Sequence, residues 1–167
     1  MKNIEEIKSA LLKGKKVDLS NLLQDYDVNS FDAYGNNILH YFIKNKKSIP
    51  YNPEAFVNEL IINGIDLNKS QNKSPGRTAL HWAVFEKDKE LVNLLLSLGA
   101  FVDVVDEDGN TPLSDSIFAF KNDDSYFIEI LLANGADKIF KNKHGVSPLD
   151  LSRMISNYNS SRLLEEN

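Results

Sequence analysis

The three histidines of this 167-residue chain are the side chains best suited to catalysis or metal binding near neutral pH. His40, His81 and His144 lie far apart in the sequence, whereas zinc ligands usually include pairs separated by only a few residues. His144 precedes Gly145 in an expected loop tip, where a lone histidine is usually an ordinary surface residue. We therefore predict no metal site.

Neighbouring carboxylates are the other candidates for chemistry, since two acids in different environments can act as general acid and base. The pairs Asp106/Asp108 and Asp123/Asp124 lie in expected loops, and no apolar pocket is expected there to raise the pKa of either carboxyl group. The sequence contains neither a glycine-rich phosphate-binding motif nor the nucleophile elbow of a hydrolase. We predict no catalytic residue and no cofactor, and expect that the chain is not an enzyme.

The composition of the chain excludes further kinds of site and partner. The chain has no cysteine, which excludes disulfides, thiolate metal ligands and cysteine nucleophiles. Its 19 basic and 24 acidic residues give a formal charge of −5, and because phosphate binding needs clustered basic residues we expect no nucleic-acid partner. No apolar run reaches the roughly 18 residues of a membrane span, and the first residues lack the apolar core of a signal peptide. We expect a cytoplasmic protein with no membrane partner.

Two short motifs recur in fixed order along the chain, and each pair of motifs encloses an apolar stretch of helical periodicity. The first motif contains a glycine followed within five residues by a leucine, and its copies are centred on Gly35, Gly76, Gly109 and Gly145. The second motif is a glycine, an apolar residue and usually an aspartate, and its copies start at Gly64, Gly99 and Gly135. A period of 33 to 41 residues indicates a stack of repeated helical units.

These two motifs resemble the ankyrin repeat, whose signature reads Asp-x-x-Gly-x-Thr-Pro-Leu-His and later Gly-Ala-Asp-Val-Asn. The best copy runs from Gly76 to Asp103 and includes Leu80-His81 and Gly99-Ala100. The resemblance implies an all-α solenoid, in which stacked helix-turn-helix pairs are joined by β-hairpin-like loops. It also implies that His40 and His81 are structural. The expected units of this single domain are an N-terminal cap at 1–31, repeats at 32–68, 69–105 and 106–141, and a C-terminal cap at 142–167.

Helix boundaries follow from residues that suit helix ends. The hydroxyls of Thr78 and Thr111 could accept backbone N–H groups at the start of a helix, and Pro112 and Pro148 suit the first turn. Glycine just past a helix favours a left-handed cap, which we expect at three positions: Gly64, Gly99 and Gly135.

Three segments depart from the regular repeat. About six extra residues around Pro50 separate the two helices of repeat 32–68, and about three extra residues fall within 121–125, around Asp123. The connector before Gly76 is two residues longer than the others and lacks their usual aspartate, so we expect an altered loop tip. Drift of exposed loops and contact with a partner both remain open as explanations.

The resemblance places the binding surface on the loop tips and on the exposed, concave side of each first helix. We favour exposure of Tyr34 and Phe85 and leave the exposure of Trp82 and Phe118 open. An aromatic centre with acidic neighbours is typical of an interface and would suit a partner with a basic or mixed-charge surface. The candidate partner-binding residues are Tyr34, Asn36, Tyr41, Arg77, Trp82, Phe85, Glu86, Glu107, Asp108, Asn110, Asp115, Phe118, Lys143 and His144.

The function expected from this resemblance is non-catalytic binding of a partner protein, as an adaptor or scaffold. The first alternative is a cytosolic bacterial immunity protein that neutralises a cognate toxin, and the second is an enzyme or small-ligand-binding module. We expect a monomer, because capped solenoids of this size commonly are.

Overall fold

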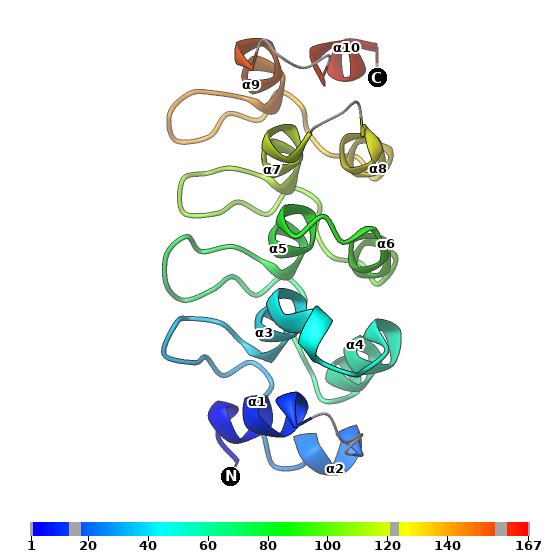
Figure 1. Cartoon of the computed structure of the whole chain (residues 1–167). Helices are drawn as coiled ribbons and strands as arrows, with labels where there is room; N and C mark the ends of the chain where they lie inside the picture. Colours follow the sequence, from blue (N-terminus) through cyan, green and yellow to red (C-terminus); the bar gives the residue numbers. More distant parts are fainter. Residues whose placement is uncertain (1, 14–17, 121–123, 156–159, 167) are drawn as a thin grey trace. The chain divides into compact units, whose positions relative to one another are not determined.

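The computed structural model describes residues 2–13, 18–120, 124–155 and 160–166. It falls into two compact units, Met1–Ala79 and Leu80–Asn167, and each is described by itself (Figure 1). Over the described ranges all regular elements are helices, with no strand. This all-helical arrangement confirms the predicted fold class.

The first unit contains α1 (Ile4–Leu12), α2 (Leu19–Leu23), α3 (Ile38–Asn45), a single 3₁₀ turn η1 (Lys46–Ser48) and α4 (Pro53–Ile62). Helix α1 packs on α3 and α2 packs on α4, so that first and second helices stack separately (Figure 1). The core is apolar and fully buried. Its centre is a stacked pair, Phe42 from α3 and Phe56 from α4, with ring centroids 4.1 Å apart.

The second unit contains α5 (Ala79–Phe85), which starts on the last residue of the first unit, α6 (Lys89–Ser97), α7 (Pro112–Ala119), α8 (Tyr126–Ala133), α9 (Pro148–Met154) and α10 (Ser160–Glu166). Figure 1 shows α5, α7 and α9 in one column and α6, α8 and α10 in the other. Helix α7 contacts α8 and α9, and α10 contacts both of those. Leucines at helical spacing, among them Leu91, Leu95, Leu113 and Leu131, fill the core between the columns.

The helix ends confirm part of the expected pattern. Pro112 and Pro148 occupy the first turns of α7 and α9, and the glycines after α4, α6 and α8 adopt left-handed conformations, with φ between 82° and 87°. The expected hydroxyl cap at Thr111 is wrong. Thr111 is the N-cap residue of α7, but its buried Oγ1 has no hydrogen-bond partner, whereas Ser147 accepts from the backbone N–H of Asp150 at 3.1 Å.

Three of the loops before first helices share one design. The side chain of the residue that opens the loop accepts hydrogen bonds from backbone N–H groups two and four residues later, and that residue is Asp32, Asp106 or Asn142. The chain then turns at a glycine of positive φ. A Cβ added to Gly109 would lie 2.9 Å from the backbone nitrogen of Lys143, so this tip glycine also permits close contact between successive loops.

The loop before α5 differs, as its length and missing aspartate predict. The N–H of Gln71 donates to the carbonyl of Arg77 six residues later, whereas the corresponding bond in the loop of Asp32 spans four residues. The Gln71 side chain instead donates to Oδ1 of Asn36 at 2.7 Å in a buried contact. The altered loop tip is therefore confirmed.

The two predicted insertions lie between the first and second helices of their repeats. The insertion near Pro50 forms η1 and the N-cap of α4, where Asn52 accepts from the N–H of Ala55 at 3.0 Å. In the other insertion, residues 121–123 and thus Asp123 lie outside the described residues. Its next residue, Asp124, forms an ion pair with Lys89 at 3.2 Å.

Candidate partner-binding surface

Two of the histidines hold the backbone in place. His40 is fully buried, and its Nδ1 accepts from the N–H of Asn37 while Oδ1 of Asn37 accepts from the N–H of His40. Nε2 of His81 lies 3.0 Å from the carbonyl oxygen of Asn110, to which it donates. Burial lowers the pKa of His40 to about 4, so this ring is neutral at physiological pH. The predicted structural role of His40 and His81 is confirmed.

His144 is exposed at its loop tip, with Nε2 4.0 Å from a carboxylate oxygen of Asp108. In the part of the chain that the structure describes, no group of three or more His, Cys, Asp or Glu side chains is placed to hold a metal ion.

In the first unit, the predicted surface residues lie in different environments. Tyr34 is 74% exposed at the tip of its loop, as predicted. Tyr41 is half-buried, because the Lys8 ammonium lies 4.8 Å from its ring centroid. Arg77 is also half-buried. The prediction of a surface role for Asn36 is wrong, because its side chain is buried against Asp32 and Gln71.

In the second unit, first helices expose large aromatic rings. Phe85, the last residue of α5, and Phe118, in the last turn of α7, are 53% and 60% exposed. Trp82 is half-buried, and its ring meets that of Phe85 edge-on with centroids 5.5 Å apart. Asp115 is 5% exposed, so the prediction that it contributes an acidic group to the surface is wrong.

The loop tips of the second unit carry mixed charge. Glu107 and Asp108 are exposed at one tip, and Lys143 and His144 at the next. The N–H of Lys143 donates to the carbonyl of Asp108 at 2.9 Å, which joins the two tips. Asn110 is half-buried, and its Oδ1 accepts from the side chain of Asn142 at 2.8 Å. Glu86 is exposed directly after Phe85. Because Asp115 is buried, the surface has one exposed carboxylate fewer than the sequence predicts.

Met154 adds an exposed apolar side chain to these aromatic rings, and sequence reasoning missed it. It is 68% exposed at the end of α9. Phe85, Phe118 and Met154 each stand nine residues after the glycine of the preceding loop tip, so they occupy the same position in successive repeats. This register was the signal that could have identified Met154. We call these three residues the apolar row. The corresponding residue of the first unit is the exposed Lys44.

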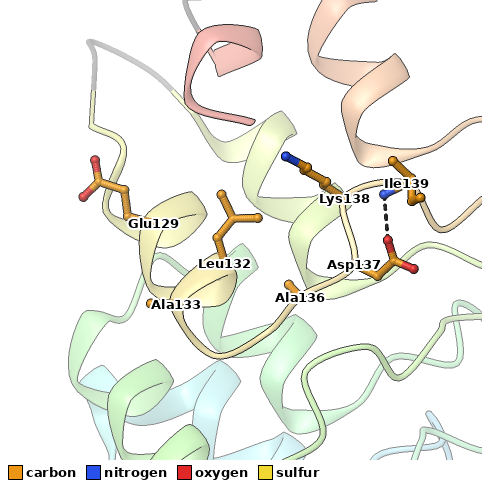
Figure 2. Close-up of a pocket in the computed structure, with 7 residues that line it drawn as sticks. All are labelled: Glu129, Leu132, Ala133, Ala136, Asp137, Lys138 and Ile139. Carbon is orange, nitrogen blue, oxygen red and sulfur yellow. Dashed lines mark hydrogen bonds between the residues drawn. The ribbon is translucent and has the colours of Figure 1, made fainter. Parts of the chain in front are cut away.

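The second unit also has a shallow hollow of about 760 Å³ beside α8, which Figure 2 shows. Leu132, Ala133 and Ile139 supply its apolar lining. Its charged groups are already engaged. Glu129 accepts from the Ser125 hydroxyl at 2.6 Å, Asp137 accepts from the N–H of Ile139 at 2.8 Å, and Lys138 donates to the carbonyl of Leu164 at 2.7 Å. No convergent set of polar groups faces the hollow, as a ligand site would need.

None of the helices in the described ranges is both long enough and apolar enough to cross a membrane.

Comparisons with known proteins agree with this architecture. A family model described as ankyrin repeats (3 copies) matches residues 7–106 and 48–142. Similar proteins include serine/threonine-protein kinase 12 of Arabidopsis thaliana, which is 42% identical over 56% of this chain and 18% of its own length. An ankyrin repeat protein of fowlpox virus is 29% identical over 83% of this chain and 40% of its own length. An ankyrin repeat protein of Rickettsia felis is 26% identical over 99% of this chain and 47% of its own length.

The chain thus spans less than half the length of these three relatives. Ankyrin repeats are generally non-catalytic modules for protein–protein interaction, and the matched region covers most of the sequence. The chain belongs to the ankyrin repeat family.

Proposed function

We propose that this chain binds a partner protein through the apolar row and the neighbouring loop tips of its second unit. The observation that carries the proposal is the exposure of Phe85, Phe118 and Met154 at one repeated position. Exposed apolar side chains that gather in one place usually mark a protein interface. Phenylalanine rings and methionine are enriched at the centres of such interfaces, while charged residues are depleted there.

The surroundings of the apolar row suit this role. Trp82 supplies a further ring at its α5 end, in edge-on contact with Phe85. Glu86, Glu107 and Asp108 provide exposed carboxylates, with Lys143 beside them, and these groups can form the polar rim of an interface. The hollow beside α8 gives catalysis no comparable support, because its charged side chains already form hydrogen bonds within the chain.

The first unit adds a second candidate contact. Tyr34 is the most exposed large side chain of its loop. Tyrosine is common at binding hot spots. Tyr41 contributes less contact area, because Lys8 already lies over its ring. We propose Tyr34 and Arg77 as secondary contacts. The immunity-protein alternative draws no specific support from the described surface, so the proposal is limited to binding.

Affinity capture with paired variants tests the proposal. The variant Phe85→Asp/Phe118→Asp places charges in the apolar row at exposed positions, where folding should survive. The matched control is Phe101→Asp/Ile139→Asn. Both side chains are 65% exposed, and each new residue already occurs at the equivalent position of another repeat, at Asp137 and Asn29.

Proteins that the wild-type chain captures from its source cells should be lost with the Phe85/Phe118 variant and retained with the control. Equal capture by the wild type and the Phe85/Phe118 variant, with circular dichroism showing that both are folded, would refute the proposed surface.

A further inference from the structure

We propose that the occupant of the apolar row is an amphipathic α-helix of the partner, with apolar residues one heptad apart and a basic flank. This inference rests on the proposed function and specifies the conformation of the bound segment. It follows from the spacing of the row and from the charges beside it.

The row has a regular spacing because its members stand on consecutive first helices. Helix α5 is joined to the start of α7 by the hydrogen bond between His81 and the carbonyl of Asn110, and α7 packs on α9. Figure 1 shows the three helices in one column of the second unit. Packed helices lie about 8–10 Å apart, so each step along the row is about 10 Å and the whole row about 20 Å.

An α-helix laid along this column matches that spacing. Its rise of about 1.5 Å per residue gives about 10 Å for seven residues, and residues seven apart lie on nearly the same face. Side chains at positions i, i+7 and i+14 would therefore reach Phe85, Phe118 and Met154 in turn. The edge-on pair of Trp82 and Phe85 and the half-buried Leu151, three residues before Met154, widen the apolar surface at both ends. This extra width suits an additional apolar residue at i+3 or i+4.

An extended segment does not match. At about 3.3 Å per residue, a step of about 10 Å takes three residues, and side chains three apart point to opposite faces of a strand. Two residues on one face are about 7 Å or 13 Å apart, and neither value equals the repeat step. The apolar row therefore selects a helix over a strand.

The charges beside the row favour basic residues on one flank of the occupant. Glu86 directly follows Phe85, and Glu107 and Asp108 are exposed at the tip of the loop that leads into α7. Lys87 and Lys143 offset part of this negative charge. The apolar contact should therefore supply most of the affinity, and the basic flank should set the orientation of the helix.

Two peptide display libraries of equal size test the inference on the immobilised full chain. One library presents helical sequences with apolar residues at i, i+7 and i+14 and Lys or Arg on one flank. The other presents extended sequences in which apolar and polar residues alternate and proline prevents helix formation. We expect binders from the helical library, with affinity for Phe118→Asp lowered about tenfold or more relative to the wild type and unchanged for Ile139→Asn.

Met154 provides a second readout, because the chain has two methionines and the other, Met1, lies at the opposite end of the sequence. Hydrogen peroxide transfers one oxygen atom to the thioether and leaves water, and the sulfoxide is detected as a mass gain of the tryptic peptide. A bound helix should slow this oxidation about fivefold or more, by an amount that follows its occupancy.

The outcomes separate the two claims. If the selected sequences are extended and still depend on Phe118, the helical occupant is wrong and the proposed function stands. If no selected sequence depends on Phe118, or none binds, both are wrong. If a helical binder depends on Phe118 and protects Met154, the inference is supported.

Discussion

Replacement of Asp103 by asparagine should stabilise this protein, because it restores a hydrogen bond that another repeat already makes. Asn29 links two repeats of the first unit in both directions: its Nδ2 donates to the carbonyl of Gly64 at 2.8 Å, and its Oδ1 accepts from the N–H of Asp66 at 2.9 Å. Asp103 occupies the same position two repeats later, after Asn68. Its carboxylate accepts from the N–H of Asp137 at 3.1 Å, but it has no hydrogen to donate to a carbonyl.

The expected gain is that of one hydrogen bond, about 0.5–1.5 kcal/mol in the free energy of unfolding. The pH dependence follows from the pKa of Asp103, which burial raises. A raised carboxyl pKa destabilises the fold above that pKa, and the cost disappears as pH falls through it. The gain in stability of Asp103→Asn over the wild type should therefore be largest near pH 7 and should shrink on acidification.

The matched control is the reverse change, Asn29→Asp, which removes the donor to the Gly64 carbonyl and should destabilise by about 1 kcal/mol or more. Urea denaturation of the wild type and both variants at pH 7 and at acid pH measures these differences. Opposite signs for the two variants at pH 7 are expected. Destabilisation by both, or an Asp103→Asn effect that does not change with pH, would refute this reasoning.

Three further predictions concern buried groups and loop glycines. Because burial lowers the pKa of His40 to about 4, stability should fall by about 3 kcal/mol between pH 6.5 and 4 as the unfolded chain alone is protonated, which denaturation at several pH values measures. Gly109→Ala should lower the melting temperature more than Gly135→Ala. Both glycines have positive φ, but a Cβ meets other atoms within 4 Å only at Gly109. Thr111→Val should be neutral or stabilising by denaturation, because its hydroxyl has no partner, whereas Ser147→Ala should cost about 1 kcal/mol.

Much of the fold could be predicted from local sequence because each repeat carries its own signals. Pro112 and Pro148 suit only a few backbone positions, and Gly99 suits the left-handed turn after a helix. The altered tip before α5 was also predictable, since a missing aspartate and two extra residues are visible in the sequence. Sequence could not show that Thr111 lacks an N-cap hydrogen bond, because that depends on the rotamer of its hydroxyl in a packed environment.

The candidate surface was harder to predict, because exposure depends on neighbouring repeats. Asn36 lies in a loop that the resemblance predicts to be exposed, but its side chain is buried and accepts a hydrogen bond from the Gln71 side chain of the next, longer loop. Asp115 is buried at a position where Trp82 is half-exposed. Met154 escaped notice because it is not aromatic, although its register equals that of Phe118.

The central claim, that the partner occupies the apolar row, is tested most directly by mapping backbone amide chemical shifts of the isotopically labelled chain while the captured partner is added. The account predicts that the largest shift changes fall at the ends of α5, α7 and α9, around Phe85, Phe118 and Met154, with smaller changes at the loop tips. Changes concentrated instead around the hollow beside α8, from Glu129 to Ile139, would contradict it.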